Sequence, residues 1–218
     1  MRRIPALLFN LSNALDEYVL QYLIGGRQGY GWRDMLGSPV VRAIGANDPV
    51  FAVWKGTIRK YQFSNALMNE MWFPYHIDHD YKPNSDIFIH VHWSQAVVDT
   101  GGPAAAPGDV KWQFEVSYAK GHQQQAFIAN INTFVVQTAD STVYEHMIAE
   151  VQLSAASPSA SQIPTADLEP DGLIEVRMFR DPADVADTLN QAPFLHYVDI
   201  HYQSDRVNTR NKAPNFYT

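Results

Sequence analysis

The sequence predicts an all-β protein: an antiparallel, jelly-roll-like β-sandwich with an N-terminal helix and an extended arm. Three observations support this class. Residues 110–118 alternate strictly between apolar and polar side chains, which is typical of a half-buried strand. Other short alternating segments are separated by turns rather than by regular helices, as in antiparallel sandwiches. Finally, 12% of the residues are aromatic and only 18% are charged, which favours a folded, aromatic-rich β protein.

Residues 1–50 are expected to form the arm, one helix and a segment that wraps around the domain. Apolar residues recur at helical spacing from Leu15 to Leu23, Asn13 can cap the start of this helix, and Gly25 and Gly26 can end it. Residues 29–49 are rich in Gly, Pro, Asn and Asp, so we expect them to be irregular.

Residues 51–205 are expected to form the sandwich and residues 206–218 a C-terminal tail, all within a single domain. The predicted strands are 51–54 and 57–63 (a hairpin), 87–93, 110–118, 126–137, 143–153, 173–179 and 196–202. Residues 99–109 and 154–172 have the composition of loops. Trp93 and Trp112 stand on apolar strand faces, which predicts core positions for both.

Composition narrows the classes of function. The net charge of −7 disfavours a nucleic-acid-binding surface, and the absence of cysteine excludes disulfides and thiolate chemistry. The first apolar run is too short for a signal peptide and no stretch is long enough to span a bilayer, so we expect a protein that is made in the cytoplasm and does not contact a membrane. No nucleophile elbow or phosphate-binding loop occurs, which predicts a protein that is not an enzyme and has no cofactor.

Histidines are concentrated in two strand-like segments, residues 87–93 and 196–202. His90 and His92 share one strand face with Phe88, so their imidazoles lie side by side. The favoured interpretation is a polar ladder, in which His90, His92 and His201 bond to one another, to Asp86 or Asp199, or to backbone carbonyls. A variant of this interpretation is a pH-sensitive latch at a subunit interface, because imidazole titrates near neutral pH.

A metal site is the competing interpretation of these histidines. A His-x-His strand in a jelly roll is typical of cupin metal sites, and the candidate ligands are His76, His79, His90, His92 and His201. A cupin-like motif needs a glutamate shortly after the histidine pair, but no acidic residue follows His92 before Asp99. The sequence therefore predicts no metal.

Several of these residues also stand in a recognisable order. Residues 73–76 read Phe-Pro-Tyr-His, 85–87 Ser-Asp-Ile and 90–93 His-Val-His-Trp, while 199–205 read Asp-Ile-His-Tyr-Gln-Ser-Asp and are followed by Thr209 and Arg210. This order resembles a group of tailed-bacteriophage virion proteins that have Pro-His, Ser-Asp, His-x-His-Trp and Asp-x-His-Tyr segments. The resemblance implies a structural protein of the virion.

The expected function is therefore assembly as a homo-oligomer at the neck or tail of a phage, as a collar or adaptor, in contact with portal, tail or capsid proteins. The alternatives are a capsid decoration or cement protein, a cupin-like metalloenzyme, and a receptor- or glycan-binding tail protein. The residues expected at interfaces are Ile4, Leu7, Leu8, Phe9, Trp32, Trp72, Phe216 and Tyr217.

Overall fold

The structure is a computed structural model that describes residues 31–42, 47–100, 106–205 and 209–217. The predicted arm and helix lie outside these ranges, together with the interface candidates Ile4, Leu7, Leu8 and Phe9. In the described part of the chain, no helix is long and apolar enough to cross a membrane.

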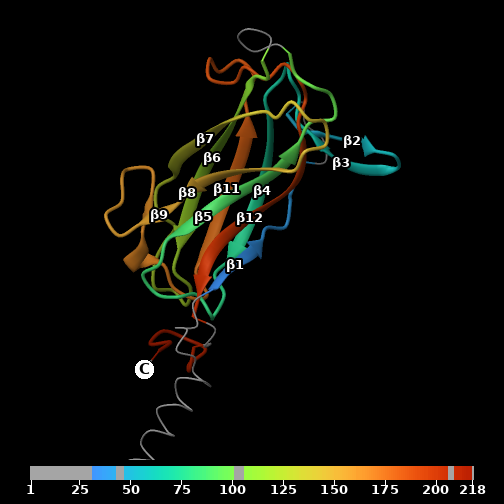
Figure 1. Ribbon diagram of the computed structural model, residues 1–218. Coiled ribbons are helices and arrows are strands. Elements are labelled where there is room, and N and C mark those ends of the chain that lie inside the picture. The colour runs from blue at the N-terminus through green and yellow to red at the C-terminus, as the bar shows by residue number, and fades with distance from the viewer. Residues whose placement is uncertain (1–30, 43–46, 101–105, 206–208, 218) are drawn as a thin grey trace, which may run out of the picture.

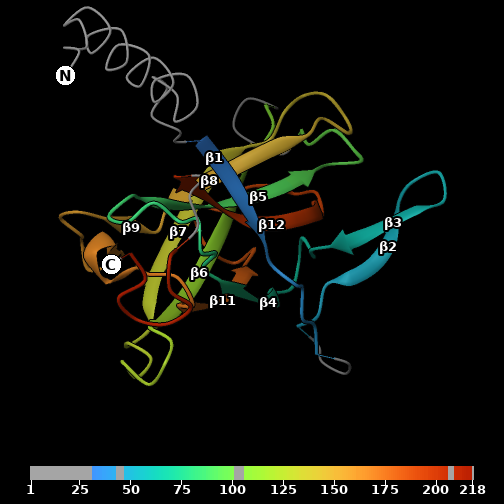
Figure 2. The same ribbon diagram turned by 90° about the horizontal axis from the view of Figure 1, so that it is seen from below.

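Two antiparallel sheets pack face to face, which confirms the predicted antiparallel β-sandwich (Figures 1 and 2). Sheet A has the order β2-β3-β12-β5-β8, and β1 pairs with β12 beside this path. Its strands are β1 (Gly31–Leu36), β2 (Val50–Lys55), β3 (Ile58–Gln62), β5 (Ile87–Ser94), β8 (Met147–Gln152) and β12 (Phe194–Ser204). Sheet B has the order β4-β11-β6-β7, with β4 (Asn69–His76), β6 (Asp109–Ala119), β7 (Ile131–Thr138) and β11 (Leu173–Arg180).

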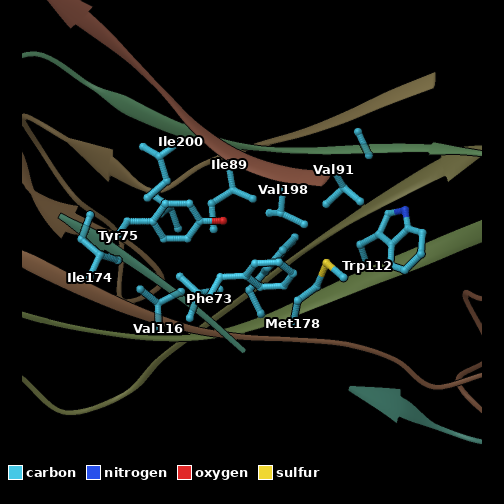
Figure 3. Packing of buried hydrophobic residues seen from close by; sticks show 14 of the residues in the cluster. Phe73, Tyr75, Ile89, Val91, Trp112, Val116, Ile174, Met178, Val198 and Ile200 are labelled. Atoms are coloured by element: carbon cyan, nitrogen blue, oxygen red, sulfur yellow. The ribbon is translucent and has the colours of Figure 1, made fainter. Parts of the chain in front are cut away.

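The core fills the space between the two sheets. Figure 3 shows Ile89, Val91, Val198 and Ile200 of sheet A facing Phe73, Tyr75, Trp112, Val116, Ile174 and Met178 of sheet B. Trp93 and Trp112 are fully buried, as predicted, and their rings meet edge to face. Fully burying an aliphatic side chain or a phenylalanine contributes about 1.5–3 kcal/mol to folding, so the inward-facing residues of the alternating strands stabilise the sandwich.

One charged pair is also fully buried, where the connection from β11 to β12 returns to the sandwich. The guanidinium of Arg180 donates from Nε and Nη2 to the carboxylate of Asp187, at 2.9 and 2.8 Å. It also donates to the carbonyl oxygens of Ser64, Leu189 and Gln191. A buried arginine is tolerated because its donors are paired in this way.

The hairpin of β2 and β3 was predicted, and Gly56 takes a positive φ of 59° in its turn. Figure 2 shows this hairpin, in cyan, extending away from the body of the sandwich. Four of its apolar side chains are each at least half exposed: Val50, Phe51, Val53 and Ile58. Such a concentration of exposed apolar side chains is typical of a contact surface.

Several predicted boundaries are wrong. Residues 29–49 are not wholly irregular, because β1 lies within them and pairs with β12 from Gly31 to Leu36. Strand β4 was not predicted; it contains Pro74, which is tolerated because β4 is an edge strand of sheet B. Strand β7 begins at Ile131 and β8 at Met147, later than predicted.

The predicted loop 154–172 contains three short elements. Strands β9 (Ser154–Ala155) and β10 (Ile163–Pro164) form a parallel pair, and the 3₁₀ turn η2 (Thr165–Asp167) follows. Two-residue strands give almost no periodic signal, which explains why the sequence pattern misses them.

Candidate functional site

All eight histidines of the chain lie in two groups. The first group, here called the sheet-A cluster, contains His90, His92, His146, His196 and His201. The second, here called the Asp171 cluster, contains His76, His79 and His122, whose ring nitrogens surround the carboxylate of Asp171.

Strand pairing builds the sheet-A cluster on the outer face of sheet A. Ile87, Ile89, Val91 and Trp93 of β5 point into the core, so His90 and His92 point away from it. Strand β12 pairs with β5 so that Asp199 lies opposite His90, and His201 lies opposite Phe88.

The two flanking strands complete this surface. In the pairing of β1 with β12, Asp34 lies opposite His201, while β8 places Glu150 opposite His90. Four strands thus bring residues that are far apart in the sequence onto one patch on the outer face of sheet A.

His90 and His201 form the centre of this patch. His90 Nε2 is 2.7 Å from Glu150 Oε2, and His201 Nδ1 is 2.5 Å from Asp34 Oδ1. The two imidazole rings stack on each other with centroids 4.7 Å apart, and Trp32 stacks on the other side of His201 at 4.8 Å. Strand pairing, ring stacking and contacts with carboxylates therefore all fix the positions of these two imidazoles.

His92 is tied to a different set of partners. Its Nδ1 is 2.8 Å from His146 Nε2, so at least one of these two rings is neutral. The Tyr197 ring stacks on it at 3.9 Å. His92 Nε2 lies 3.1 Å from Asp199 Oδ1, but the two atoms are not aligned for a hydrogen bond and both are buried without another partner.

Asp199 is the least accessible charged group of the patch, with 1% of its surface exposed. Burial raises the pKa of the Tyr75 phenol in the core, and the negative charge of Asp199 raises it further. Burial also acts to raise the pKa of Asp34, but hydrogen bonds with His201 and Asp199 and the charges of His201 and His90 outweigh it, so this pKa lies below its usual value.

His196 lies at an irregularity in β12, where the register with β5 shifts between Leu195 and Tyr197. Its Nε2 is 2.9 Å from Ser94 Oγ, and Trp54 Nε1 donates to the same oxygen at 2.9 Å. Burial, followed by the nearby charges of Lys60, His146 and His92, lowers the pKa of His196 to about 4. His196 is therefore neutral at pH 7.

In the Asp171 cluster, three imidazoles share one carboxylate. His79 Nε2 and His76 Nε2 lie 3.0 and 3.2 Å from Asp171 Oδ1, and His122 Nε2 lies 2.7 Å from Oδ2. Burial acts to raise the pKa of Asp171, but the hydrogen bond with His122 and the charges of His79 and His76 outweigh it and hold this pKa below its usual value. Asp171 also has a positive φ of 61°, a conformation that aspartate tolerates better than most residues.

A groove of about 610 Å³ opens beside the Asp171 cluster. Its lining mixes both signs of charge: Arg33, Asp78, His79, Asp80, Thr209, Arg210, Asn211 and Lys212. Arg33 pairs with Asp80 across it, and Asp80 also accepts hydrogen bonds from Tyr202 and Ser204 at 2.8 and 2.6 Å. These contacts tie β1, β12 and the 78–80 turn together.

The structure brings together the residues of the predicted polar ladder: His90 stacks on His201, and His92 lies against Asp199. Asp86, the other predicted partner, instead accepts a hydrogen bond from Gln152 at 3.0 Å. Among the metal candidates, His76 and His79 lie in the other cluster. The sequence reasoning missed Asp34, Glu150 and His146, because β1 was not predicted and because alternation along one strand does not identify the neighbouring strand.

The predicted interface residues that the structure describes have different surroundings. Trp32 is 49% exposed on the outer face of sheet A, and Tyr217 is 40% exposed. Trp72 is half-buried beneath the guanidinium of Arg42. Phe216 does not fit an interface, because it is only 4% exposed and packs against His79 and His122 of its own chain.

The surroundings of the histidines also bear on the cupin-like alternative. The space between the sheets is filled by apolar side chains, and the sheet-A cluster lies on the outer face of sheet A. Metalloenzymes hold a substrate in a concave site that excludes water. That the protein is not an enzyme stays a prediction.

No protein-family model matches this sequence, and no curated protein matches it. The solved structures that are similar in part include the following two. One contains the CBM22-1–GH10 modules of endo-1,4-beta-D-xylanase 10B from Clostridium thermocellum complexed with xylohexaose, at 9% identity and a TM-score of 0.34 over 84% of this chain. The chain spans 28% of the length of that structure. The other is TmCBM61 in complex with beta-1,4-galactotriose, at 9% identity and a TM-score of 0.26, covering 80% of this chain and 84% of that one. Neither likeness is strong enough to carry an argument about function.

Proposed function

We propose that this protein is a structural component of a tailed-bacteriophage virion, assembling as a homo-oligomer at the neck or tail and contacting other virion proteins. The observation that carries the proposal is the β2–β3 hairpin, which extends from the sandwich with exposed apolar side chains (Figure 2). Exposed apolar side chains on this hairpin do not stabilise a monomer in water, whereas an assembly buries them against a neighbouring subunit.

The strand order supports the jelly-roll form of the sandwich. The order β3-β12-β5-β8 in one sheet and β4-β11-β6-β7 in the other means that most successive strands alternate between the sheets. Jelly rolls occur in viral capsid proteins, in lectins and in cupins. The fold is thus compatible with the proposal but does not select it over the alternatives.

Two of the segments that carry the resemblance to phage virion proteins lie on paired strands, 90–93 on β5 and 199–204 on β12. Tyr202 and Ser204 of the second segment donate to Asp80. Their contacts tie strands and turns together rather than line a pocket. These contacts support the proposal that the shared residues stabilise a rigid domain, which then assembles with other proteins.

The assembly is tested by sedimentation velocity of the full chain over a range of concentrations. Phe51→Asp and Ile58→Asp place a charge on the apolar hairpin, and Val185→Asp is the matched control because Val185 is 93% exposed in a different connection. We expect the wild type and the control to form an oligomer that both hairpin variants lose, because a stable contact buries about 1,000 Å² or more.

A wild-type chain that remains monomeric at every concentration contradicts the proposal. Deleting residues 1–10 is a second test of the role assigned to the N-terminal arm: we expect a folded protein with impaired assembly, as judged by circular dichroism and by sedimentation.

A receptor- or glycan-binding tail protein is the second candidate, and Trp32 is the observation that favours it. Its half-exposed ring stacks on His201 and meets Phe88 edge to face at 5.8 Å, which presents a flat aromatic surface on sheet A. This candidate predicts binding to bacterial surface polysaccharide that Trp32→Ala abolishes while the fold survives. Capsid decoration differs from the main proposal only in the place of the protein in the particle.

A further inference from the structure

Four side chains of the sheet-A cluster meet the geometric requirement for a metal site. Asp34, His90, Asp199 and His201 can each offer one ligand atom, and these four atoms all lie within 4.8 Å of one another. They come from β1, β5 and β12, so each position is fixed by strand pairing rather than by a loop.

The charge balance of this group points to a cation. Asp199 is buried, and its Oδ1 has no aligned hydrogen-bond donor although His92 Nε2 lies 3.1 Å away. In the ranges that the structure describes, no lysine or arginine forms an ion pair with Asp34 or Asp199. A buried carboxylate oxygen without a partner is costly, and a bound cation removes that cost.

The donor set identifies the kind of ion. Two imidazole nitrogens and two carboxylate oxygens suit a divalent transition metal such as Zn²⁺, whereas Ca²⁺ and Mg²⁺ prefer oxygen ligands alone. Tetrahedral zinc at bond lengths of about 2.0–2.2 Å needs ligand atoms about 3.3–3.6 Å apart, so modest side-chain rotations are sufficient to close the group. Glu150, bonded to His90, supplies the carboxylate that commonly orients a metal-binding histidine.

We propose that the outer face of sheet A binds one Zn²⁺ ion per chain through Asp34, His90, Asp199 and His201, as a structural cross-link that holds β1 to β12 and β5. The ion takes the place of the protons that the carboxylates and imidazoles otherwise share. Its binding therefore releases protons and weakens as the pH falls through the range in which imidazole protonates. The site is independent of the assembly role, because it lies away from the β2–β3 hairpin.

The direct test uses the full chain with its affinity tag removed, stripped with a chelator and then titrated with ZnCl₂ in a calorimeter. We expect one Zn²⁺ per chain with a dissociation constant in the micromolar range or below. At a hundredfold excess over that constant, the melting temperature rises by about 5 °C or more.

Site variants and a matched control decide whether this binding occurs at the proposed place. Asp34→Asn, His90→Gln and His201→Gln are each expected to weaken Zn²⁺ binding at least tenfold. His122→Gln, which changes a histidine of the Asp171 cluster, leaves the affinity unchanged. Asp34 is exposed, so its variant keeps the test valid if a histidine variant does not fold.

Three results overturn the proposal: no binding at about 100 µM Zn²⁺, binding that survives all three site variants, or binding that His122→Gln weakens as much as they do.

Discussion

The two histidine clusters differ in their ratio of imidazoles to carboxylates. In the Asp171 cluster, three imidazoles surround one carboxylate; His79 and His122 form hydrogen bonds with it, and His76 lies 3.2 Å away. In the centre of the sheet-A cluster, two imidazoles meet two carboxylates, one of them buried with an oxygen that lacks an aligned donor. Both oxygens of Asp171 therefore have a hydrogen-bond partner, whereas one oxygen of Asp199 has none.

This difference shows that the number of histidines does not identify a metal site. The Asp171 cluster has more imidazoles per carboxylate, but both oxygens of its carboxylate already have a hydrogen-bond partner. The sheet-A cluster is the better candidate because a cation resolves its surplus of negative charge.

The largest effect is expected from removing the carboxylate of the Asp171 cluster. Asp171→Ala leaves His79 and His122 without their acceptor and places alanine at a φ of 61°, so the free energy of unfolding falls by about 2–3 kcal/mol. Asp171→Asn keeps an acceptor oxygen and tolerates this φ, so it loses about 1 kcal/mol. Urea unfolding at pH 7 measures both; equal stability of the two variants contradicts the account.

The second prediction separates the clusters by pH. The pKa of His196 is about 4 in the folded chain and about 6.5 in the unfolded chain, so the unfolded chain binds the proton first as the pH falls. Stability is fully present above pH 6.5 and is lost progressively towards pH 4, by about 1–2 kcal/mol after allowance for partial exposure. His196→Gln is expected to remove this loss, as measured by thermal unfolding at a series of pH values.

Asp171 contributes in a different window, because its pKa lies below 3.8 in the folded chain. Its contribution is fully present above the unfolded value and is lost only as the pH falls further through the folded value. The Asp171→Asn variant is therefore expected to differ from wild type in the steepness of acid unfolding below about pH 4. A His196→Gln variant with the wild-type loss between pH 6.5 and 4 contradicts the assignment of the first window.

A smaller effect is expected from Trp32→Ala on the sheet-A face. The substitution removes the stack on His201 and the edge contact with Phe88, which together contribute about 1 kcal/mol. Urea unfolding at pH 7 measures the loss. Leu36→Ala is a suitable control, because Leu36 belongs to the same strand and is 70% exposed; if it costs as much, the stacking is not the cause.

The smallest effect on stability is expected from Asp34→Asn in metal-free protein. Asp34 is exposed and its pair with His201 is screened by water, so the change in unfolding free energy is no more than about 0.5 kcal/mol. The same variant is expected to weaken Zn²⁺ binding strongly. If the unfolding free energy of the metal-free variant falls by much more, then the Asp34–His201 pair itself, rather than a metal ion, links β1 to β12.

Much of the sandwich follows from alternation along single strands. The buried residues of β6, the β2–β3 hairpin and the shared strand face of His90 and His92 were all predicted, because each depends only on a period of two residues. Strand β1 was missed because glycine, proline and asparagine around it give the composition of a loop.

The site was harder to predict than the fold. Asp34 and His201 are separated by 167 residues and meet only because β1 pairs with β12. His196 shows a second limit: strict alternation places it on the core face with Val198, but the register shift beside it brings it to Ser94 and Trp54. Bulges and strand neighbours depend on the tertiary structure and give little signal in the local sequence.

The central claim is that this chain is built into a virion, and labelling of particles tests it most directly. Particles assembled from a phage genome that encodes the chain can be purified on a density gradient, incubated with a gold-labelled antibody against the chain and imaged by electron microscopy. The account predicts gold at the neck or tail, with several labels per particle. Particles that carry no label while free protein remains in the lysate contradict it.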